Sequence, residues 1–200
     1  MKVFIQSIVA QILLNPYIFW RGYQAIPPQK SWRIPYVLFF ILELSLFFFG
    51  FTFRNVLPDS VMIAIQYICN TWYIASIYIT LSLLVLEVLR LSNRFFHWFP
   101  GWMTGHWKQT KLTLFFLIIA IVTGLMFHAY HVVAYPIVKD VYVTLPKGSS
   151  ERDSMTIVMM SDLHIGEMIG KELVQRYVKM SNEQHPDMVV LVGDIMDYES

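Results

Sequence analysis

Two short apolar runs near the end of the chain decide its fold. The first reads IVMMSDLHIG over residues 157–166, and the second reads MVVLVGDIMD over residues 188–197. Each starts with apolar, largely β-branched or Met residues and then reaches a carboxylate, which is typical of a buried strand with a polar end. Residues 171–182, between the two runs, have the length and composition of a helix. This order predicts a parallel strand–helix–strand unit.

The acidic residues of this unit are expected at one edge of the sheet, because parallel strands bring their carboxyl ends together. The four side chains expected there are Asp162, His164, Asp194 and Asp197. Carboxylates held close together repel one another, and a divalent cation relieves that repulsion. Oxygen and imidazole ligands together suit Mn, Fe or Zn, and two metals can share one carboxylate. The pattern therefore favours a metal site.

A structural reading of the same residues has to be weighed against the metal site. An Asp at a strand end often only caps the following helix, and an Asp-x-His pair alone is common by chance. The signal becomes specific because Asp162-x-His164 is followed, after the next predicted strand, by Gly193-Asp194-x-x-Asp197.

This pair of motifs resembles the opening of the calcineurin-like metallophosphoesterase signature. The resemblance implies that Asp162 and His164 are ligands of a first metal and that Asp194 bridges two metals. It implies that Asp197 supports the site without binding metal, and that Gly193 allows a tight backbone turn. The resemblance covers roughly residues 140–200. The hydrophobic region before it is similar to the membrane-anchored bacterial branch of the family.

The resemblance implies a hydrolase that cleaves a phosphate mono- or diester through a dinuclear metal centre, within a four-layer α/β/β/α sandwich. The GNH[DE] and GHxH blocks that continue the family signature do not occur before Ser200. We therefore expect an incomplete active site, with no catalytic residue beyond the metal ligands and with little turnover by these 200 residues alone. The expected partners are two divalent metal ions, membrane lipid and a phosphate ester, with a lipid-linked phosphate as one candidate.

Composition indicates a membrane protein. The chain is 56% hydrophobic and 14% charged, with a mean hydropathy of +0.51. Residues 1–138 hold nine Lys and Arg against three Asp and Glu, whereas residues 139–200 hold six against eleven. We expect a helical transmembrane region over residues 1–138 and a partial phosphoesterase domain over residues 139–200. The acidic second part argues against nucleic-acid binding.

The hydrophobic stretches predict four membrane spans, at residues 3–20, 36–53, 61–89 and 112–133. Basic residues concentrate in the first and third loops, residues 21–35 and 90–111. The positive-inside rule then predicts those loops in the cytoplasm and the soluble segment on the extracytoplasmic side. The resemblance to the bacterial branch of the family implies a bacterial plasma membrane. Residues 140–145 have β-branched character and predict a further strand.

Two alternative functions stay open from the sequence. A transport-type protein with an incidental soluble tail is suggested by Glu43, a carboxylate in the middle of a span. The competing interpretation of Glu43 is a protonated or hydrogen-bonded packing residue. The polar residues of the first span, Gln6, Ser7, Gln11 and Asn15, favour a contact between helices over contact with lipid. A non-catalytic or decayed membrane protein is the other alternative. Glu87, near the end of a span, is expected to pair with Arg90.

Overall fold

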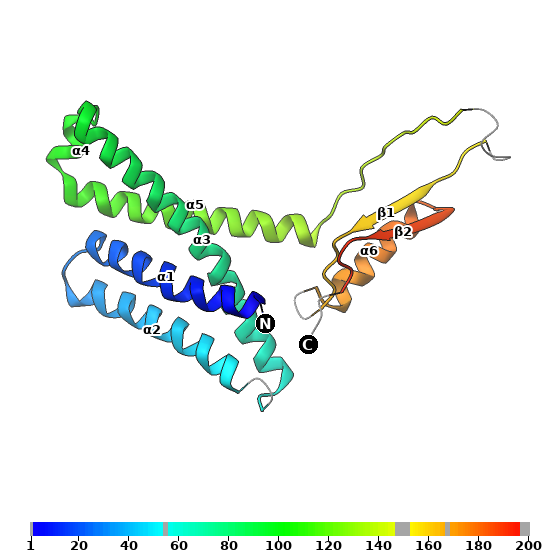
Figure 1. Cartoon of the computed structure of the whole chain (residues 1–200), viewed down its shortest axis with the longest axis horizontal. Helices are drawn as coiled ribbons and strands as arrows, with labels where there is room; N and C mark the ends of the chain where they lie inside the picture. The colour runs from blue at the N-terminus through cyan, green and yellow to red at the C-terminus, as the bar shows by residue number, and fades with distance from the viewer. Residues whose placement is uncertain (1, 54–55, 147–152, 167–168, 197–200) are drawn as a thin grey trace. The chain divides into compact units, whose positions relative to one another are not determined.

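The computed structural model of the chain divides into two compact units, Met1–Ala129 and Tyr130–Ser200. It describes all residues except 1, 54–55, 147–152, 167–168 and 197–200 (Figure 1). The first unit is helical, and the second contains a small two-stranded sheet with one helix.

Long helices make up the first unit. They are α1 (Lys2–Ala25), α2 (Lys30–Thr52), α3 (Asp59–Phe96), the short α4 (Gly101–Gly105) and α5 (Trp107–Ala134), which continues into the second unit. Of the described helices, α2, α3 and α5 are long and apolar enough to cross a membrane. The first predicted span, residues 3–20, lies within α1, and its crossing of the membrane stays a prediction.

The loops between the spans are shorter than the sequence suggested. The predicted loop over residues 21–35 is mostly helical, since α1 continues to Ala25 and α2 starts at Lys30. The third predicted loop, residues 90–111, is helical up to Phe96 and again from Trp107. With 38 residues, α3 is about 57 Å long at 1.5 Å per residue, well beyond the ~30 Å hydrocarbon core. Both loops were predicted from their polar residues. Polar residues do not end a helix as long as its backbone hydrogen bonds can continue, so the helices extend into both predicted loops.

The helical unit is apolar outside and partly polar inside. Leu42 is 60% exposed and Phe127 is 71% exposed, whereas Glu43 is 3% exposed. The buried polar residues of this unit also include Gln11 and Asn15 of α1. This arrangement suits a lipid environment, where apolar side chains gain nothing by facing inward and polar groups need partners.

The second unit contains the predicted strand–helix–strand arrangement. Strand β1 (Ile157–Ser161) pairs in parallel with β2 (Met188–Val192), and α6 (Lys171–Glu183) connects them (Figure 1). The register runs from Ile157 opposite Met188 to Ser161 opposite Val192, so both strands end at the same level. The parallel pairing confirms the sequence prediction for this unit. The remaining layers of the expected four-layer sandwich are not shown in the structure.

The predicted strand over residues 140–145 does not form. These residues have no regular secondary structure, and Val141 and Tyr142 are 76% and 92% exposed. β-branched residues favour a strand only where a neighbouring strand offers backbone partners and a face to pack against. In the described part of this unit, the sheet consists of β1 and β2 alone.

Candidate metal site at the strand ends

Asp162 and Asp194 lie beside each other at the carboxyl edge of the two-stranded sheet. Asp162 directly follows β1, and Asp194 follows β2 by two residues. The backbone pairing continues past the strands, because Asp162 N donates to Val192 O at 3.0 Å and His164 N donates to Asp194 O at 3.1 Å. The expectation that these acidic residues converge on one edge is therefore met by the backbone.

The Asp162 side chain turns toward the second loop. Its Oδ1 accepts a hydrogen bond from the Asp194 backbone N at 3.3 Å. This contact holds the Asp162 carboxylate over the Gly193–Asp194 peptide, so the two motifs are connected by a side chain as well as by the sheet. Both Asp162 and Asp194 are exposed to solvent, which leaves their oxygen atoms accessible.

Glycine is required at position 193 for two reasons. Its φ of +78° is in the left-handed region, where side chains with a Cβ are disfavoured. A Cβ built at this position would also overlap the Asp162 carboxylate. Asp162 and His164 themselves adopt positive φ values of 50° and 48°, so the chain turns sharply immediately after β1. Such backbone strain often clusters where function fixes the geometry.

The three predicted ligands share this edge without forming a compact ligand cluster. Over the part of the chain that the structure describes, no group of three or more His, Cys, Asp and Glu side chains is close enough to hold a metal ion. His164 is exposed and is tied to Asp194 through its backbone. Asp197, predicted to support the site, lies outside the described residues. The donor types nevertheless match what Mn, Fe or Zn accept, with two carboxylates and one imidazole.

Two residues of α6 that the sequence did not single out contact the last turn of α5, which belongs to the same unit. The Arg176 guanidinium donates to the carbonyl of Ala134 and lies 4.8 Å from the Tyr135 ring centroid. Tyr177 donates its hydroxyl to Val133 O at 3.0 Å. The last carbonyl groups of a helix lack hydrogen-bond partners within the helix. A cation at this end also interacts favourably with the negative end of the helix dipole. Within this unit, α6 is thereby held against the last turn of α5.

Glu43, the other candidate for a functional site, is hydrogen-bonded within the helical unit. Gln11 Nε2 donates to Glu43 Oε1 at 2.7 Å, and Asn15 Nδ2 donates to Glu43 Oε2 at 2.9 Å. Trp72 Nε1 donates to Asn15 Oδ1 at 2.9 Å, so the cluster joins α1, α2 and α3. Both carboxylate oxygens thus have partners from α1. This arrangement agrees with the interpretation of Glu43 as a packing residue and provides no independent sign of a transport path.

Comparison with known proteins gives the same family as the motifs. The chain is 28% identical over 204 residues to a "Transmembrane protein with metallophosphoesterase domain" of Danio rerio, covering 97% of this chain and 46% of that protein. It is 25% identical over 178 residues to a protein of the same name from Bos taurus, covering 86% of this chain and 38% of that protein. An "Uncharacterized metallophosphoesterase" of Campylobacter jejuni is 37% identical over 62 residues, 31% of this chain and 16% of that protein.

These relatives support a metallophosphoesterase family with membrane association, as the motif resemblance predicted. The chain spans less than half the length of each of the three. The two that cover most of the chain are animal proteins, so the resemblance extends beyond the bacterial branch. No protein-family model matches the chain, and no solved structure matches it.

Proposed function

We propose that this chain, similar to membrane-associated metallophosphoesterases, carries part of a membrane-anchored hydrolase that cleaves a phosphate mono- or diester at a dinuclear metal site. The observation that carries the proposal is the pairing of the two motifs. Asp162-x-His164 follows β1, Gly193-Asp194 follows β2, and the Asp162 carboxylate accepts a hydrogen bond from the Asp194 backbone. The similarity to proteins named as metallophosphoesterases supports the same reaction class.

The ligands in this proposal are Asp162, His164 and Asp194, with Asp194 shared between two ions. Divalent cations in such a site neutralise charge on the phosphoryl oxygens and assist attack by water. The chain itself contributes the alignment, because the paired strands fix the backbone of Asp162 and Asp194 relative to each other. Gly193 allows the second loop to pass under the Asp162 carboxylate. Asp197 is proposed to support the site from the same loop.

The proposal is tested first by metal binding. The purified chain in detergent is titrated with Mn²⁺ by calorimetry, and the Asp162→Ala and Asp194→Ala variants are compared with it. Loss of a ligand should weaken the affinity at least as much as loss of a residue that supports a ligand, which is about 10–100-fold. Asp140→Asn is the matched control, because Asp140 is an exposed acid in the same unit and outside the motifs. Equal Mn²⁺ affinity in all four proteins would contradict the proposal.

Turnover is measured separately with p-nitrophenyl phosphate and bis-p-nitrophenyl phosphate as monoester and diester probes, and it is expected to be low because these 200 residues carry only part of the proposed site. Hydrolysis that requires Mn²⁺ and is lost in Asp162→Ala supports the reaction class, and the ratio between the two probes reports which ester is preferred. A lipid-linked phosphate is the substrate class that the membrane anchor favours. Hydrolysis that persists unchanged in Asp194→Ala would exclude this site as its source.

We further propose that the unit with the strands faces the extracytoplasmic side. The support is the basic composition of the first and third loops. Cys69 is the single cysteine and is buried, so Cys69→Ala gives a background without thiols. In that background, Ser154→Cys and Gln29→Cys are labelled in intact cells with a membrane-impermeant maleimide. We expect labelling of Ser154→Cys alone. Labelling of Gln29→Cys alone would show the opposite orientation and contradict the proposal.

A further inference from the structure

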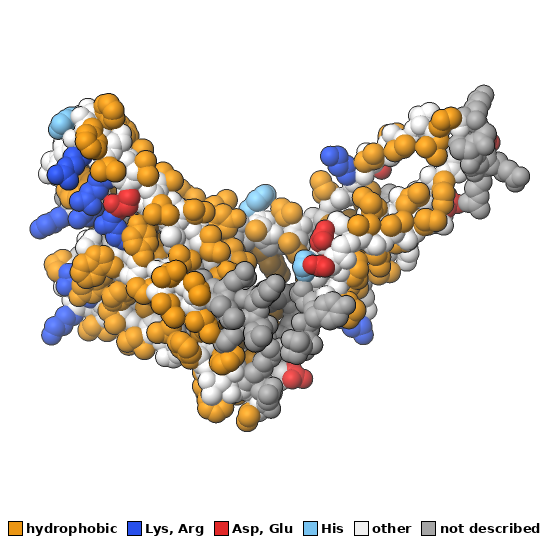
Figure 2. Space-filling view, viewed as in Figure 1, with side chains coloured by type: hydrophobic (Ala, Val, Ile, Leu, Met, Phe, Trp, Pro, Cys, Tyr) orange, Lys and Arg blue, Asp and Glu red, His pale blue; other side chains and the backbone are white. Residues whose placement is uncertain are grey.

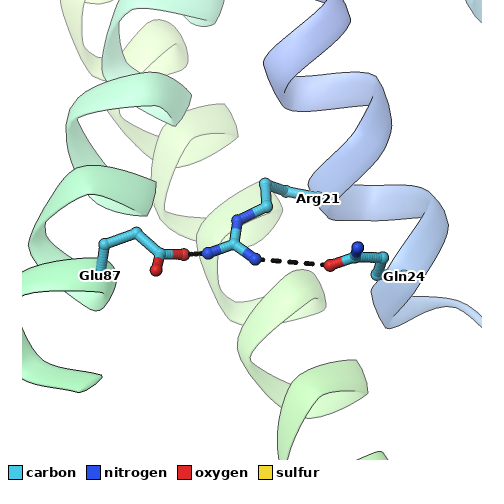
Figure 3. Close-up of polar contacts among 3 residues, drawn as sticks. All are labelled: Arg21, Gln24 and Glu87. Atoms are coloured by element: carbon cyan, nitrogen blue, oxygen red, sulfur yellow. Dashed lines mark hydrogen bonds and ion pairs between the residues drawn. The ribbon is translucent and has the colours of Figure 1, made fainter. Parts of the chain in front are cut away.

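One end of the helical unit is strongly basic. Figure 2 shows Lys and Arg side chains gathered there, at the left of the view. Glu87 of α3 pairs with Arg21 of α1 rather than with Arg90 as the sequence suggested, and Arg21 also contacts Gln24 Oε1 at 3.4 Å (Figure 3). The partner of Glu87 is a cation on another helix, α1, and the sequence could suggest only partners nearby on the same helix. With Glu87 occupied by Arg21, Arg90 and Lys111 have no carboxylate partner among the described residues.

A cavity of about 790 Å³ opens beside this basic end. Its charged lining residues are Arg21, Glu87, Arg90 and Lys111, from the last turns of α1 and α3 and the first turns of α5. The lining also reaches Val122 and Met126, far along α5. From Lys111 to Met126 the distance along the helix is about 22 Å, which exceeds one leaflet of the hydrocarbon core, about 15 Å.

Large aromatic side chains of α5 contact α2, and one such pair, Phe115 and Tyr36, lines the cavity. Phe115 lies 6.1 Å from Tyr36 between ring centroids, and Phe116 lies 6.0 Å from Trp32. Such spacers hold the helix backbones apart. Beyond the charged end, the lining is mostly apolar, with far more apolar than polar surface.

An empty space or a water-filled one is unfavourable at this depth. If the space were empty, the side chains that line it would lack van der Waals contacts on that side. If it held water, each molecule would need two to four hydrogen-bond partners, which an apolar lining does not supply. The surrounding bilayer offers acyl chains that fill such a space. The cations at its end offer a place for a phosphate, since Trp107 and Trp98 line that end as interfacial aromatic residues do.

We propose that this cavity binds one anionic phospholipid, with its phosphate at Arg90 and Lys111 and an acyl chain along the wall that includes Val122. Lys111 Nζ lies 5.9 Å from the Trp107 ring centroid, and a cation beside a Trp ring is typical of residues at the headgroup level. Charge complementarity selects an anionic over a zwitterionic lipid, because three cations face one carboxylate that is already paired.

The proposal does not depend on the phosphoesterase function. The residues that line the cavity all belong to the unit Met1–Ala129, whereas Asp162 and Asp194 belong to the unit Tyr130–Ser200. We propose this lipid as a bound structural lipid, separate from any substrate of the metal site. Loss of lipid binding should leave Mn²⁺ binding at Asp162 and Asp194 unchanged, so the two proposals fail separately.

The test uses native mass spectrometry of the full chain, released from nanodiscs that contain equal amounts of phosphatidylglycerol and phosphatidylcholine. One retained phosphatidylglycerol per chain is expected. The variant Arg90→Gln with Lys111→Gln should lower the affinity about fivefold for each cation removed. The matched control is Arg94→Gln with Lys108→Gln, which removes two cations from the same region but none from the lining. Val122→Trp should exclude the acyl chain, since Val122 is 4% exposed and lines the cavity.

Three outcomes would overturn the proposal. The first is equal retention of phosphatidylglycerol and phosphatidylcholine, which would remove the role of the cations. The second is equal loss in the control pair, which would indicate general attraction to a basic surface. The third is a lipid-free dimer, which would show that a second copy fills the cavity. The Gln variants keep the long polar side chains at the helix ends, so they test the idea even if Val122→Trp does not fold.

Discussion

The two units of this protein expose apolar side chains for opposite reasons. In the helical unit, apolar side chains such as Leu42 point outward while Glu43 is buried with polar partners. In the second unit, strand residues such as Met159 and Leu191 are 70% and 50% exposed although their backbones are paired. The first pattern suits lipid, because the apolar side chains face outward and the buried polar groups are hydrogen-bonded. The second is a sheet with apolar faces, which gain stability only when covered, by about 25 cal/mol per Å².

The comparison teaches that side-chain hydrogen bonds join the helices of the first unit, whereas backbone hydrogen bonds join the two strands of the second. The cluster of Gln11, Asn15, Glu43 and Trp72 joins three helices by side-chain hydrogen bonds. The strand ends are joined by backbone hydrogen bonds from Asp162 N and His164 N. Substitutions that remove a side-chain partner should therefore weaken the contacts between helices, whereas the strand pairing should be sensitive mainly to changes that distort the backbone.

The largest effect is expected at the proposed metal ligands. Asp194→Ala should reduce Mn²⁺ affinity by about 100-fold or more while the strand pairing persists, because its backbone, and not its side chain, joins the sheet. Circular dichroism and Mn²⁺ titration of the same sample separate the two effects. If Asp194→Ala lost its secondary structure together with metal binding, the side chain would have a structural role that the backbone contacts do not explain.

Glu43→Ala is expected to have the next largest effect, and only in the helical unit. It removes the acceptor of two hydrogen bonds, and interhelical bonds in membranes contribute about 0.6 kcal/mol on average and at most about 1.7 kcal/mol. The unfolding free energy in detergent should fall by about 1–3 kcal/mol. Ser45→Ala, at an exposed position of the same helix, serves as the control. A stability equal to that of the control would mean that side-chain bonds do not hold this unit.

Gly193→Ala should distort the second unit. Its left-handed φ costs about 1–2 kcal/mol for a residue with a Cβ, and the added methyl meets the Asp162 carboxylate. We expect faster amide hydrogen exchange in the loops after β1 and β2, together with weaker Mn²⁺ binding. Gly170→Ala is the matched control, because its φ is −77° and nothing lies within 4 Å of the added Cβ. Similar exchange rates in the two variants would show that the backbone turn tolerates a side chain.

Arg176→Gln should have the smallest effect, about 0.5–1.5 kcal/mol for one lost hydrogen bond. It releases the Ala134 carbonyl and the Tyr135 ring, so hydrogen exchange should increase in α6. Lys179→Gln removes the same charge from the same helix, where the Lys179–Glu183 pair at 3.9 Å is exposed and contributes little. If hydrogen exchange in α6 increased equally in both variants, the cause would be the lost positive charge on the helix and not the lost contact with the end of α5.

Much of the candidate site followed from local sequence pattern. The strands, the helix between them and their parallel pairing were predicted from apolar runs that end in Asp162 and Asp194, and the structure confirms all three. Residues 140–145 were predicted as a strand and are irregular, because a strand needs a partner that local sequence does not specify. The role of Arg176 was missed, since its acceptor is 42 residues away along the chain.

The sequence by itself determined which segments are apolar enough for a membrane and which residues could bind a cation, because hydropathy and side-chain chemistry are local properties. Only the tertiary structure decided that Glu87 pairs with Arg21, that Gln11 and Asn15 both bond to Glu43, and that Asp162 bonds to the backbone of Asp194. The physical reason is distance along the chain. Each of these contacts joins residues at least 28 positions apart, and their meeting depends on how whole helices and strands pack.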